Sequence, residues 1–368
     1  MRRGYAWRIG SSVSWSAEGV GVIAGVGQRL RSDWRRSAGL LLVAALTGCG
    51  NGDSQEKFAG PTMGSSYSIQ YVRHAGLPGP AQVRQQVEAI LTEVDQQLST
   101  YRSDSDIERF NALPANSCQP MPAAVLQLVQ VGEQLSRASE GAYDLTVGPL
   151  MNLWGFGPQA RTVQVPSEQA LAQVRQRVGY QHLRIEGEQL CKDAPVAVDF
   201  DSIAAGYTVD RIAAALGGLG ISSFLVEVTG ELKAVGTKLD GKPWRIALEE
   251  PRDDQQVVER ILALDGYGVS TSGDYRNYFE QGGRRYSHTF DARTGAPVLH
   301  DLAAVTVIAP QALIADGWST LLLILGPERG LEYAEKHGIA AFFVMRTDSG
   351  FVTRSSQAFI RLSGENPQ

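Results

Sequence analysis

The segment TSGDY at residues 271–275, followed by YSHTFDARTG at 286–295, is the most informative part of this sequence. Short clusters of Gly, Asp, Ser and Thr ordinarily form turns, so each segment taken alone predicts a turn. Apolar, β-rich runs lie on either side, at 261–264 and at 303–308. The sequence therefore predicts strands with polar turns between them in this region.

Apolar residues at helical spacing predict helices nearer the N-terminus. One helix is expected over about 81–99, a second around 125–135, and a third around 171–178, for which Ser167 is a suitable cap. Further β-rich runs at 183–185, 224–228 and 244–248 are interleaved irregularly with these helices. No G-x-G-x-x-G or G-x-x-x-x-G-K-[ST] motif opens a helix, which argues against a doubly wound nucleotide-binding fold. An α+β fold of mixed sheets and helices fits better.

The composition of the chain is that of a globular enzyme-sized protein. The 368 residues are 43% hydrophobic, enough for one large core or two modest ones. The net charge of -5 comes without long runs of like charge, which argues against a nucleic-acid-binding groove. Cys49, Cys118 and Cys191 lack the Cys/His pairing of zinc or iron–sulfur sites. Spacing alone does not decide whether Cys118 and Cys191 pair.

The N-terminal segment has the order of a secretion signal. Arg31, Arg35 and Arg36 precede an apolar run at 40–46 that is too short to span a bilayer. The run ends in LTGC at 46–49, which resembles a bacterial lipobox, although a Cys can follow an apolar stretch by coincidence. We expect a signal peptide with lipobox at 1–49, lipidation at Cys49, a flexible tether at 50–57 and one folded domain at 58–364.

The segment ADGWST at 315–320 is a candidate metal site. It stands at the head of an apolar stretch that continues to Leu325 and predicts a helix. Asp316 and Thr320 are four residues apart and so share one helix face, where a carboxylate and a hydroxyl can reach the same ion. Ligands that are all oxygen favour magnesium. The alternative is an acidic helix start that only caps itself.

Taken together and in order, the polar segments resemble the ApbE family of FAD:protein FMN transferases. The resemblance covers nearly all of the chain after the tether and implies an ApbE-like, tunnelling-fold-like body. Besides 271–275, 286–295 and 315–320, it rests on TMGSSYSI at 62–69, STYR at 99–102, GAYDLTVGPL at 141–150 and DFDSIAAGYTVD at 199–210.

The resemblance implies roles for particular residues. His288 would activate the acceptor hydroxyl, and Asp316 would take part in catalysis as a magnesium ligand together with the Ser202 carbonyl, Thr320 and Ser319. The residues implied to contact FAD are Met63, Tyr101, Ala142, Tyr143, Asp144, Asp199, Ala205 and Phe290.

The chain departs from the family pattern at several of these segments. Tyr143 replaces the usual Phe and keeps a flat ring. Ala205 stands where many members have Lys or Glu, and Asp201 stands where a small residue is usual. Ala292 replaces a Pro. A Gly-Gly-[Asp/Asn] turn appears as Thr229-Gly230-Glu231, so that turn must accommodate a Cβ atom.

The function implied by the resemblance is magnesium-dependent transfer of FMN from FAD to a Thr or Ser hydroxyl of an acceptor flavoprotein, with release of AMP. The expected partners are acceptor subunits of membrane redox complexes and, through the lipid, the membrane. The expected location is the bacterial cell envelope, facing the periplasm. Two alternatives remain: hydrolysis of FAD to FMN and AMP at the same site, and a non-catalytic FAD-binding lipoprotein.

Overall fold

The structure, a computed structural model, describes residues 52–160, 163–252, 255, 257–275 and 277–364. The predicted signal peptide and lipobox, Cys49 included, lie outside the described residues. Within the described part of the chain, no helix combines the length and the apolar character needed to cross a membrane.

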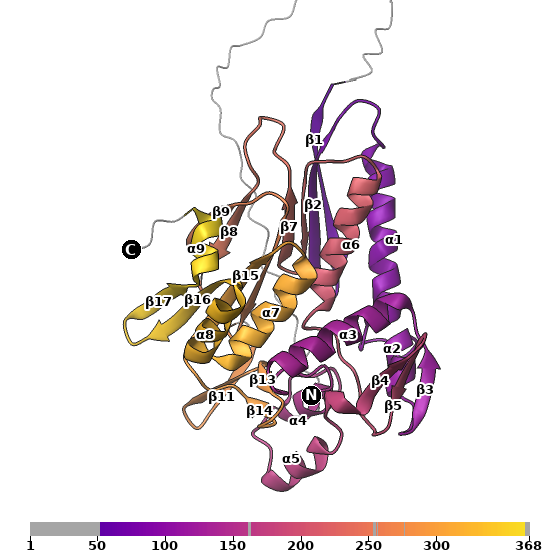
Figure 1. The fold of residues 1–368 in the computed structure, drawn as a ribbon, viewed down its shortest axis with the longest axis vertical. Helices are drawn as coiled ribbons and strands as arrows, with labels where there is room; N and C mark the ends of the chain where they lie inside the picture. The colour runs from indigo at the N-terminus through magenta and orange to yellow at the C-terminus, as the bar shows by residue number, and fades with distance from the viewer. Residues whose placement is uncertain (1–51, 161–162, 253–254, 256, 276, 365–368) are drawn as a thin grey trace, which may run out of the picture. The chain divides into compact units, whose positions relative to one another are not determined.

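An eight-stranded antiparallel sheet forms the centre of the fold (Figure 1). Both faces of its inner strands are covered, so that all eight residues of the strand at Leu302–Ala309 are buried. The strands lie in the order β1 (Ser54–Thr62), β2 (Ser65–Arg73), β6 (Phe224–Val228), β7 (Glu231–Val235), β10 (Tyr267–Gly273), β15 (Leu302–Ala309), β16 (Ala340–Thr347) and β17 (Gly350–Ser355).

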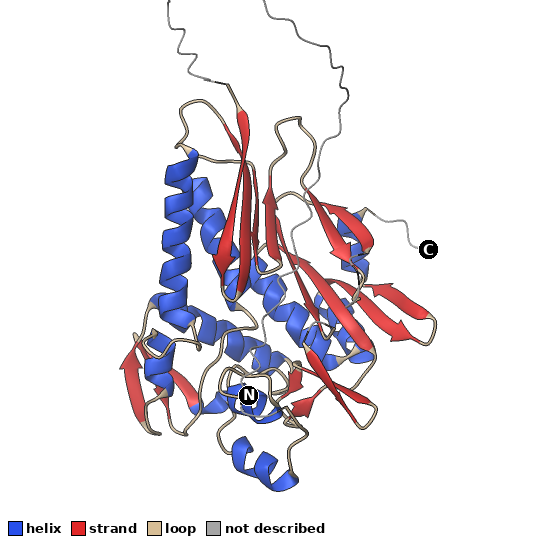
Figure 2. Cartoon of the chain, turned by 180° about the vertical axis from the view of Figure 1, so that it is seen from behind, coloured by secondary structure: helices blue, strands red, loops and turns tan. Residues whose placement is uncertain are grey.

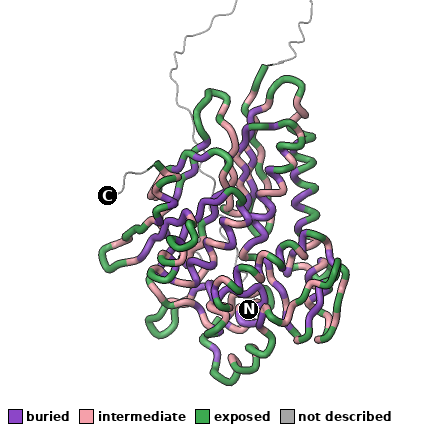
Figure 3. Tube along the Cα trace, in the orientation of Figure 1, coloured by how far each residue is buried: buried purple, intermediate pink, exposed green. Residues whose placement is uncertain are grey.

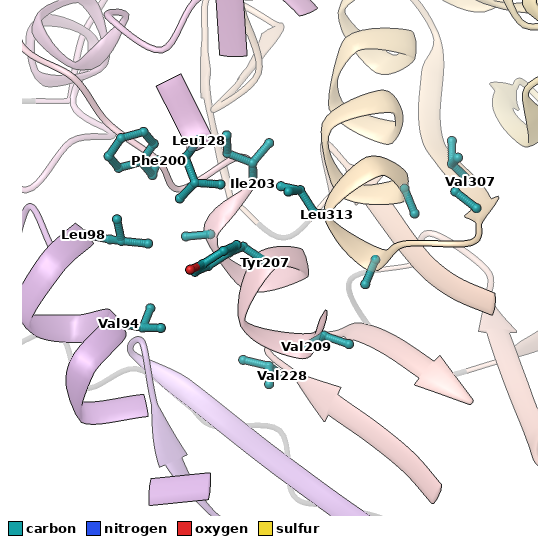
Figure 4. Close-up of a cluster of buried hydrophobic side chains, with 14 of the residues drawn as sticks. Val94, Leu98, Leu128, Phe200, Ile203, Tyr207, Val209, Val228, Val307 and Leu313 are labelled. Atoms are coloured by element: carbon teal, nitrogen blue, oxygen red, sulfur yellow. The ribbon is translucent and has the colours of Figure 1, made fainter. Parts of the chain in front are cut away.

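Helices cover one face of this sheet, and the reverse view of Figure 2 shows the strands in front of them. The helices on this face are α1 (Pro80–Leu98), α6 (Ala204–Gly218), α7 (Ala312–Leu325) and α8 (Pro327–His337), with α3 (Ala123–Ala138) packed beneath α7. The main hydrophobic core lies between them and the sheet, where Leu98, Phe200, Tyr207 and Leu313 meet (Figure 4). Figure 3 shows this buried interior surrounded by exposed loops.

A second hydrophobic cluster covers the other face of the sheet. It is formed by Trp244, by the hairpin of β8 (Arg245–Glu249) and β9 (Val258–Ala263), and by α9 (Gln357–Ser363). The α+β fold class expected from the irregular order of elements is therefore confirmed.

The helices expected from apolar spacing are present. The buried residues of α1 recur at helical spacing from Val83 to Leu98. In α5 (Glu168–Arg175), the Ser167 side chain accepts a hydrogen bond from the Ala170 N–H, as predicted, although Val178 lies beyond the helix. The predicted flexible tether at 50–57 was too long, because Ser54 already pairs with Arg73 in the sheet. Edge-strand pairing depends on distant residues and is not visible in a local pattern.

A smaller region lies at the end of α1 and α3 (Figure 1). Its three-stranded sheet has the order β3 (Ser117–Pro120), β5 (Gln189–Lys192), β4 (Leu183–Glu186), and a disulfide joins Cys118 to Cys191 across β3 and β5. The remaining elements are α2 (Asp106–Asn111), α4 (Gly148–Trp154), the 3-10 turn η1 (Tyr180–His182), and the hairpins β11 (Tyr278–Gln281) with β12 (Arg284–Ser287) and β13 (Phe290–Asp291) with β14 (Ala296–Pro297).

Candidate active site

Side-chain oxygen atoms of α7 lie next to side-chain oxygen atoms of β10 at the centre of the molecule. Alternation along β10 turns Ser270 and Ser272 toward the same face. The Ser272 Oγ lies 2.8 Å from the Ser319 Oγ and 3.0 Å from the Thr320 Oγ1. The Ser270 Oγ lies 3.2 Å from the Ser319 Oγ and donates to the Asp316 Oδ1 at 3.3 Å. The structure thus brings Asp316, Ser319 and Thr320 together, bridged by two serines.

Helix α6 holds Asp316 from the other side. The Gly206 N–H, in the first turn of α6, donates to the Asp316 Oδ2 at 2.9 Å. The helices approach so closely here that a Cβ atom on Gly206 would lie 2.5 Å from the Ala312 carbonyl oxygen. Glycine is therefore required by space at this position.

Asp210 fixes the start of α7 against α6. Its carboxylate accepts hydrogen bonds from the Ala312 N–H at 3.1 Å and the Leu313 N–H at 3.0 Å. Lys233 of β7 forms an ion pair with the same carboxylate at 3.0 Å. The carboxylate thus binds free N–H groups at the start of α7 from a neighbouring helix, because Gln311, the N-cap residue of α7, makes no side-chain capping bond. The Asp residue that closes the 199–210 segment therefore positions the helix that carries the site.

The carboxylates of Asp316, which is buried, and Glu231, which is half-buried, both accept a hydrogen bond from the Ser270 Oγ. Burial, and then the charge of Glu231, raise the pKa of Asp316 well above its usual range. Burial likewise raises the pKa of Glu231, whose Oε1 receives a hydrogen bond from the Ser270 Oγ at 3.5 Å. Within the described part of the chain, neither carboxylate forms an ion pair with Lys or Arg. Carboxylates and hydroxyls without a cation are a donor set that fits a hard divalent ion.

A second polar cluster surrounds the segment before α6. The Tyr143 hydroxyl lies 2.7 Å from the Ser202 Oγ, and the Tyr143 ring is buried. Burial raises the pKa of the Tyr143 hydroxyl, and the charges of Asp316 and Asp199 raise it further. Tyr143 is thus hydrogen-bonded to the metal-ligand candidate Ser202 and lies near enough to Asp316 and Asp199 to be affected by their charges.

Asp199 and Tyr101 form the outer part of this cluster. Burial, with the charge of Asp201, raises the pKa of Asp199 to about 8, while the Asp201 N–H donates to its Oδ1 at 2.8 Å. The Tyr101 side chain is 71% exposed, which leaves its ring available to a ligand. Partial desolvation and the charges of Asp201 and Asp199 raise the pKa of the Tyr101 hydroxyl to about 12.

Ala142 and Asp144 form hydrogen bonds with neighbouring segments of the protein. The Asp144 carboxylate accepts hydrogen bonds from the Thr146 N–H, the Thr146 hydroxyl and the Tyr180 N–H, all at 2.7–2.8 Å. The Ala142 carbonyl accepts a hydrogen bond from the Ala292 N–H at 3.0 Å, which connects this segment to 286–295. In the structure, the Asp144 carboxylate thus stabilises the turn at Thr146 and does not project into solvent.

The His288 imidazole is positioned by a backbone carbonyl group. The Asn277 carbonyl oxygen lies 3.2 Å from the His288 Nδ1, so Nδ1 carries the proton and donates, and Nε2 keeps its lone pair. Burial lowers the pKa of His288. A neutral imidazole with a free Nε2 can act as a base. No hydrogen bond between described residues joins His288 to Asp316.

The other three predicted cofactor contacts have different environments. Met63 stands in the β1–β2 turn at φ 47° and its side chain is 39% exposed. Ala205 is buried in the first turn of α6. Phe290 is also buried and packs edge-on against Trp154 and Phe156, with ring centroids 6.2 and 5.9 Å apart.

Three residues of the site were missed by the sequence reasoning: Ser270, Ser272 and Glu231. Ser270 and Ser272 flank Thr271, so strand alternation puts both serines on one face of the strand. The alternation does not tell which face of the sheet that is. Glu231 was recognised only as part of a turn. That turn does accommodate a side chain, because Thr229 adopts φ 55° and its hydroxyl donates to the Glu231 Oε2 at 2.9 Å.

The chain is similar to known proteins over most of its length. Residues 63–343 match the model of the ApbE family. The FAD:protein FMN transferase of Vibrio cholerae serotype O1 is 42% identical over 323 residues, which are 88% of this chain and 96% of the relative. The apo form of the Pseudomonas stutzeri flavinyl transferase ApbE is 57% identical with a TM-score of 0.80, covering 86% of this chain and 98% of that one. The flavin transferase ApbE of Vibrio cholerae has a TM-score of 0.79 at 40% identity, covering 84% and 99%.

Proposed function

The chain belongs to the ApbE family, and on this premise we propose that it transfers FMN from FAD to a Thr or Ser hydroxyl of an acceptor flavoprotein and releases AMP. Relatives that share 38–42% of its residues are FAD:protein FMN transferases. The single observation that carries the proposal is the pair of carboxylates of Asp316 and Glu231, which the Ser270 hydroxyl of β10 bridges, while the Gly206 N–H at the start of α6 donates to Asp316. Hydrolysis and simple storage of FAD use the same residues, but the relatives of 38–42% identity do not favour either.

Magnesium is the ion we propose for this site. Asp316, Thr320, Ser319 and the Ser202 carbonyl would hold it, and the unpaired charge of Asp316 and Glu231 supports a divalent cation there. When bound, the ion would supply positive charge that offsets the negative charge of the pyrophosphate.

The residues of the chain have separate parts in the transfer. The exposed Tyr101 ring and the exposed Met63 would contact the flavin dinucleotide. The free Nε2 of His288 would accept the proton of the acceptor hydroxyl. That oxygen forms a bond to the phosphorus of the FMN half, the bond from this phosphorus to the bridging oxygen breaks, and AMP leaves with that oxygen.

Mass spectrometry of acceptor subunits tests this function. The protein is incubated with FAD, magnesium and purified candidate subunits of membrane redox complexes. The expected result is a mass increase of one FMN on the acceptor, with one AMP released for each FMN attached. AMP released without acceptor labelling would indicate a hydrolase, and bound FAD that never turns over would indicate a carrier.

A lipid-anchored location in the cell envelope, facing the periplasm, is proposed from LTGC at 46–49. Lipid on Cys49 would keep the enzyme beside membrane redox complexes. Replacing Cys49 by Ser should move the protein from the membrane fraction to the soluble fraction while leaving FMN transfer in vitro unchanged. Membrane retention of the variant would contradict this location.

A further inference from the structure

A cavity of about 420 Å³, with both polar and apolar residues in its walls, lies beside the candidate active site and shares one residue with it. Its walls come from α2, the start of α4, the chain after α4 and the segment that ends in Asp199. Asp199 is its only lining residue that belongs to the predicted FAD or metal contacts. The cavity therefore adjoins the predicted FAD contacts at Asp199.

Several hydrogen-bonding groups in this cavity have no partner among the described residues. Thr100 is only 8% exposed, yet its Oγ1 forms no hydrogen bond there. Arg177 is exposed, and its guanidinium forms no ion pair or hydrogen bond with a described residue. The Gln159 Oε1 accepts from the Asn152 Nδ2 at 2.6 Å, which leaves the two N–H groups of the Gln159 amide free. A buried hydroxyl without a partner is costly and suggests that a ligand completes it.

The chemistry of the lining fits a polypeptide better than a nucleotide. None of the lining residues is aromatic, so a flavin or adenine ring would find no side chain to stack on. Arg177 and Gln159 offer donors, while Glu108 and Asp199 offer acceptors. An extended main chain presents both N–H and C=O groups and can pair with both kinds.

We propose that this cavity binds the segment of the acceptor protein that flanks the hydroxyl to be modified. The inference rests on the proposed function, because a reaction that joins two substrates needs two sites that meet. Asp199 is the meeting point of the FAD site and the cavity. The volume lies within the range of about 300–1,000 Å³ that is usual for ligand pockets. Arg177 anchors a main-chain carbonyl or a carboxylate of the acceptor, and Thr100 completes its hydrogen bonds with the acceptor main chain.

Two variants and a matched control test this proposal. Arg177→Glu reverses the charge at the rim, and Thr100→Val removes the unpartnered hydroxyl without changing its shape. Arg329→Glu makes the same charge change on the exposed face of α8, away from the cavity. The probe is the acceptor subunit that mass spectrometry shows to gain one FMN, with FMN attachment measured while acceptor and FAD are varied in turn. FAD affinity is measured separately by quenching of flavin fluorescence.

We expect the KM for acceptor to rise about tenfold in Arg177→Glu, the effect of losing one charge-assisted contact. Thr100→Val should raise it about fivefold. The FAD affinity of both variants and every parameter of Arg329→Glu should match the wild type. A parallel loss of FAD affinity would assign the cavity to FAD and overturn the proposal, as would unchanged kinetics in both variants. If mass spectrometry finds no subunit that gains FMN from the wild-type protein, the proposed function itself is refuted, and the acceptor site with it.

Discussion

Asp316 and Glu231 are two residues whose carboxylates a bound ligand would stabilise. The carboxylates of Asp316 and Glu231 repel each other, and their partial removal from water disfavours their charged forms. Hydrogen bonds from the Gly206 N–H and the Ser270 hydroxyl offset only part of this cost. A divalent cation would offset much more, which is why we expect stability and activity to depend on the same carboxylate.

Replacing Asp316 by Asn should separate these two effects. Asn keeps an oxygen for the Gly206 N–H but removes the buried charge, so the metal-free variant should unfold at a higher temperature than the wild type. FMN transfer should fall roughly 100-fold or more, because a metal ligand is lost. Magnesium should raise the unfolding temperature of the wild type but not of the variant, as thermal unfolding with and without EDTA would show. Undiminished acceptor labelling would refute the metal assignment.

Asp199 predicts a pH dependence of stability. Burial raises its pKa to about 8, above the value of about 3.9 expected for the unfolded chain. Because the folded state holds the proton more tightly, this stabilisation is complete below about pH 4 and is lost as the pH rises through about 8. Asn does not titrate, so the stability of Asp199→Asn relative to the wild type should increase between pH 5 and 8.

Urea denaturation at a series of pH values measures this difference. Its slope should be at most about 1.4 kcal/mol per pH unit, the limit for one proton. Asp348→Asn, in the exposed turn between β16 and β17, controls for the removal of one negative charge. Stability curves of Asp199→Asn and the wild type that run parallel from pH 5 to 8 would show that Asp199 is charged throughout this range.

At the scale of elements, the contact between α6 and α7 determines the geometry of the site. Gly206 allows the close approach, Asp210 caps α7, and Asp316 hydrogen-bonds back to α6. Each of these contacts sets the position of one helix along the other, so that Asp316 and Ser202 belong to one rigid unit. Packed helices of this kind do not adjust continuously to an added atom.

The variant Gly206→Ala should therefore destabilise the protein by about 1–3 kcal/mol, since its Cβ atom would press on the Ala312 carbonyl. FMN transfer should fall with it, because α7 must move. Gly217→Ala is the matched control in the same helix, where a Cβ atom meets nothing within 4 Å. It should leave activity intact and raise the free energy of unfolding by up to about 1 kcal/mol. Equal stability of the two variants in urea would contradict a packing constraint at Gly206.

On the scale of the whole molecule, the sequence predicts the features that depend on residues close together in the chain. The buried faces of α1 and α3 and the Ser167 cap could be read from spacing, because an amphipathic helix contains its own signal. The shared face of Asp316 and Thr320 follows from the same periodicity. The order of the eight strands, the beginning of β1 at Ser54 and the meeting of Ser272 with α7 depend on pairing between distant residues, and no local pattern carries them.

The pairing of Cys118 with Cys191 is another long-range feature, since the two residues are 73 positions apart. The disulfide holds β3 and β5 next to Lys192, whose Nζ donates to the Asn111 and Val196 carbonyls at 3.0 Å. The Asn111 side chain in turn bonds both the N–H and the carbonyl of Val198. The cross-link is thus connected, through three residues, to the wall that ends in Asp199.

Loss of this cross-link should lower the stability of the oxidised protein by about 2–4 kcal/mol, because a closed loop in the unfolded chain gains freedom. The double variant Cys118→Ser with Cys191→Ser removes both sulfurs and avoids a lone thiol. A reducing agent should lower the unfolding temperature of the wild type toward that of the double variant, whose own unfolding temperature should not change. An equal response of both proteins would mean that the reductant acts elsewhere. An unfolding temperature of the double variant equal to that of the untreated wild type would mean that hydrogen bonds through Lys192 and Asn111 hold this wall without the sulfurs.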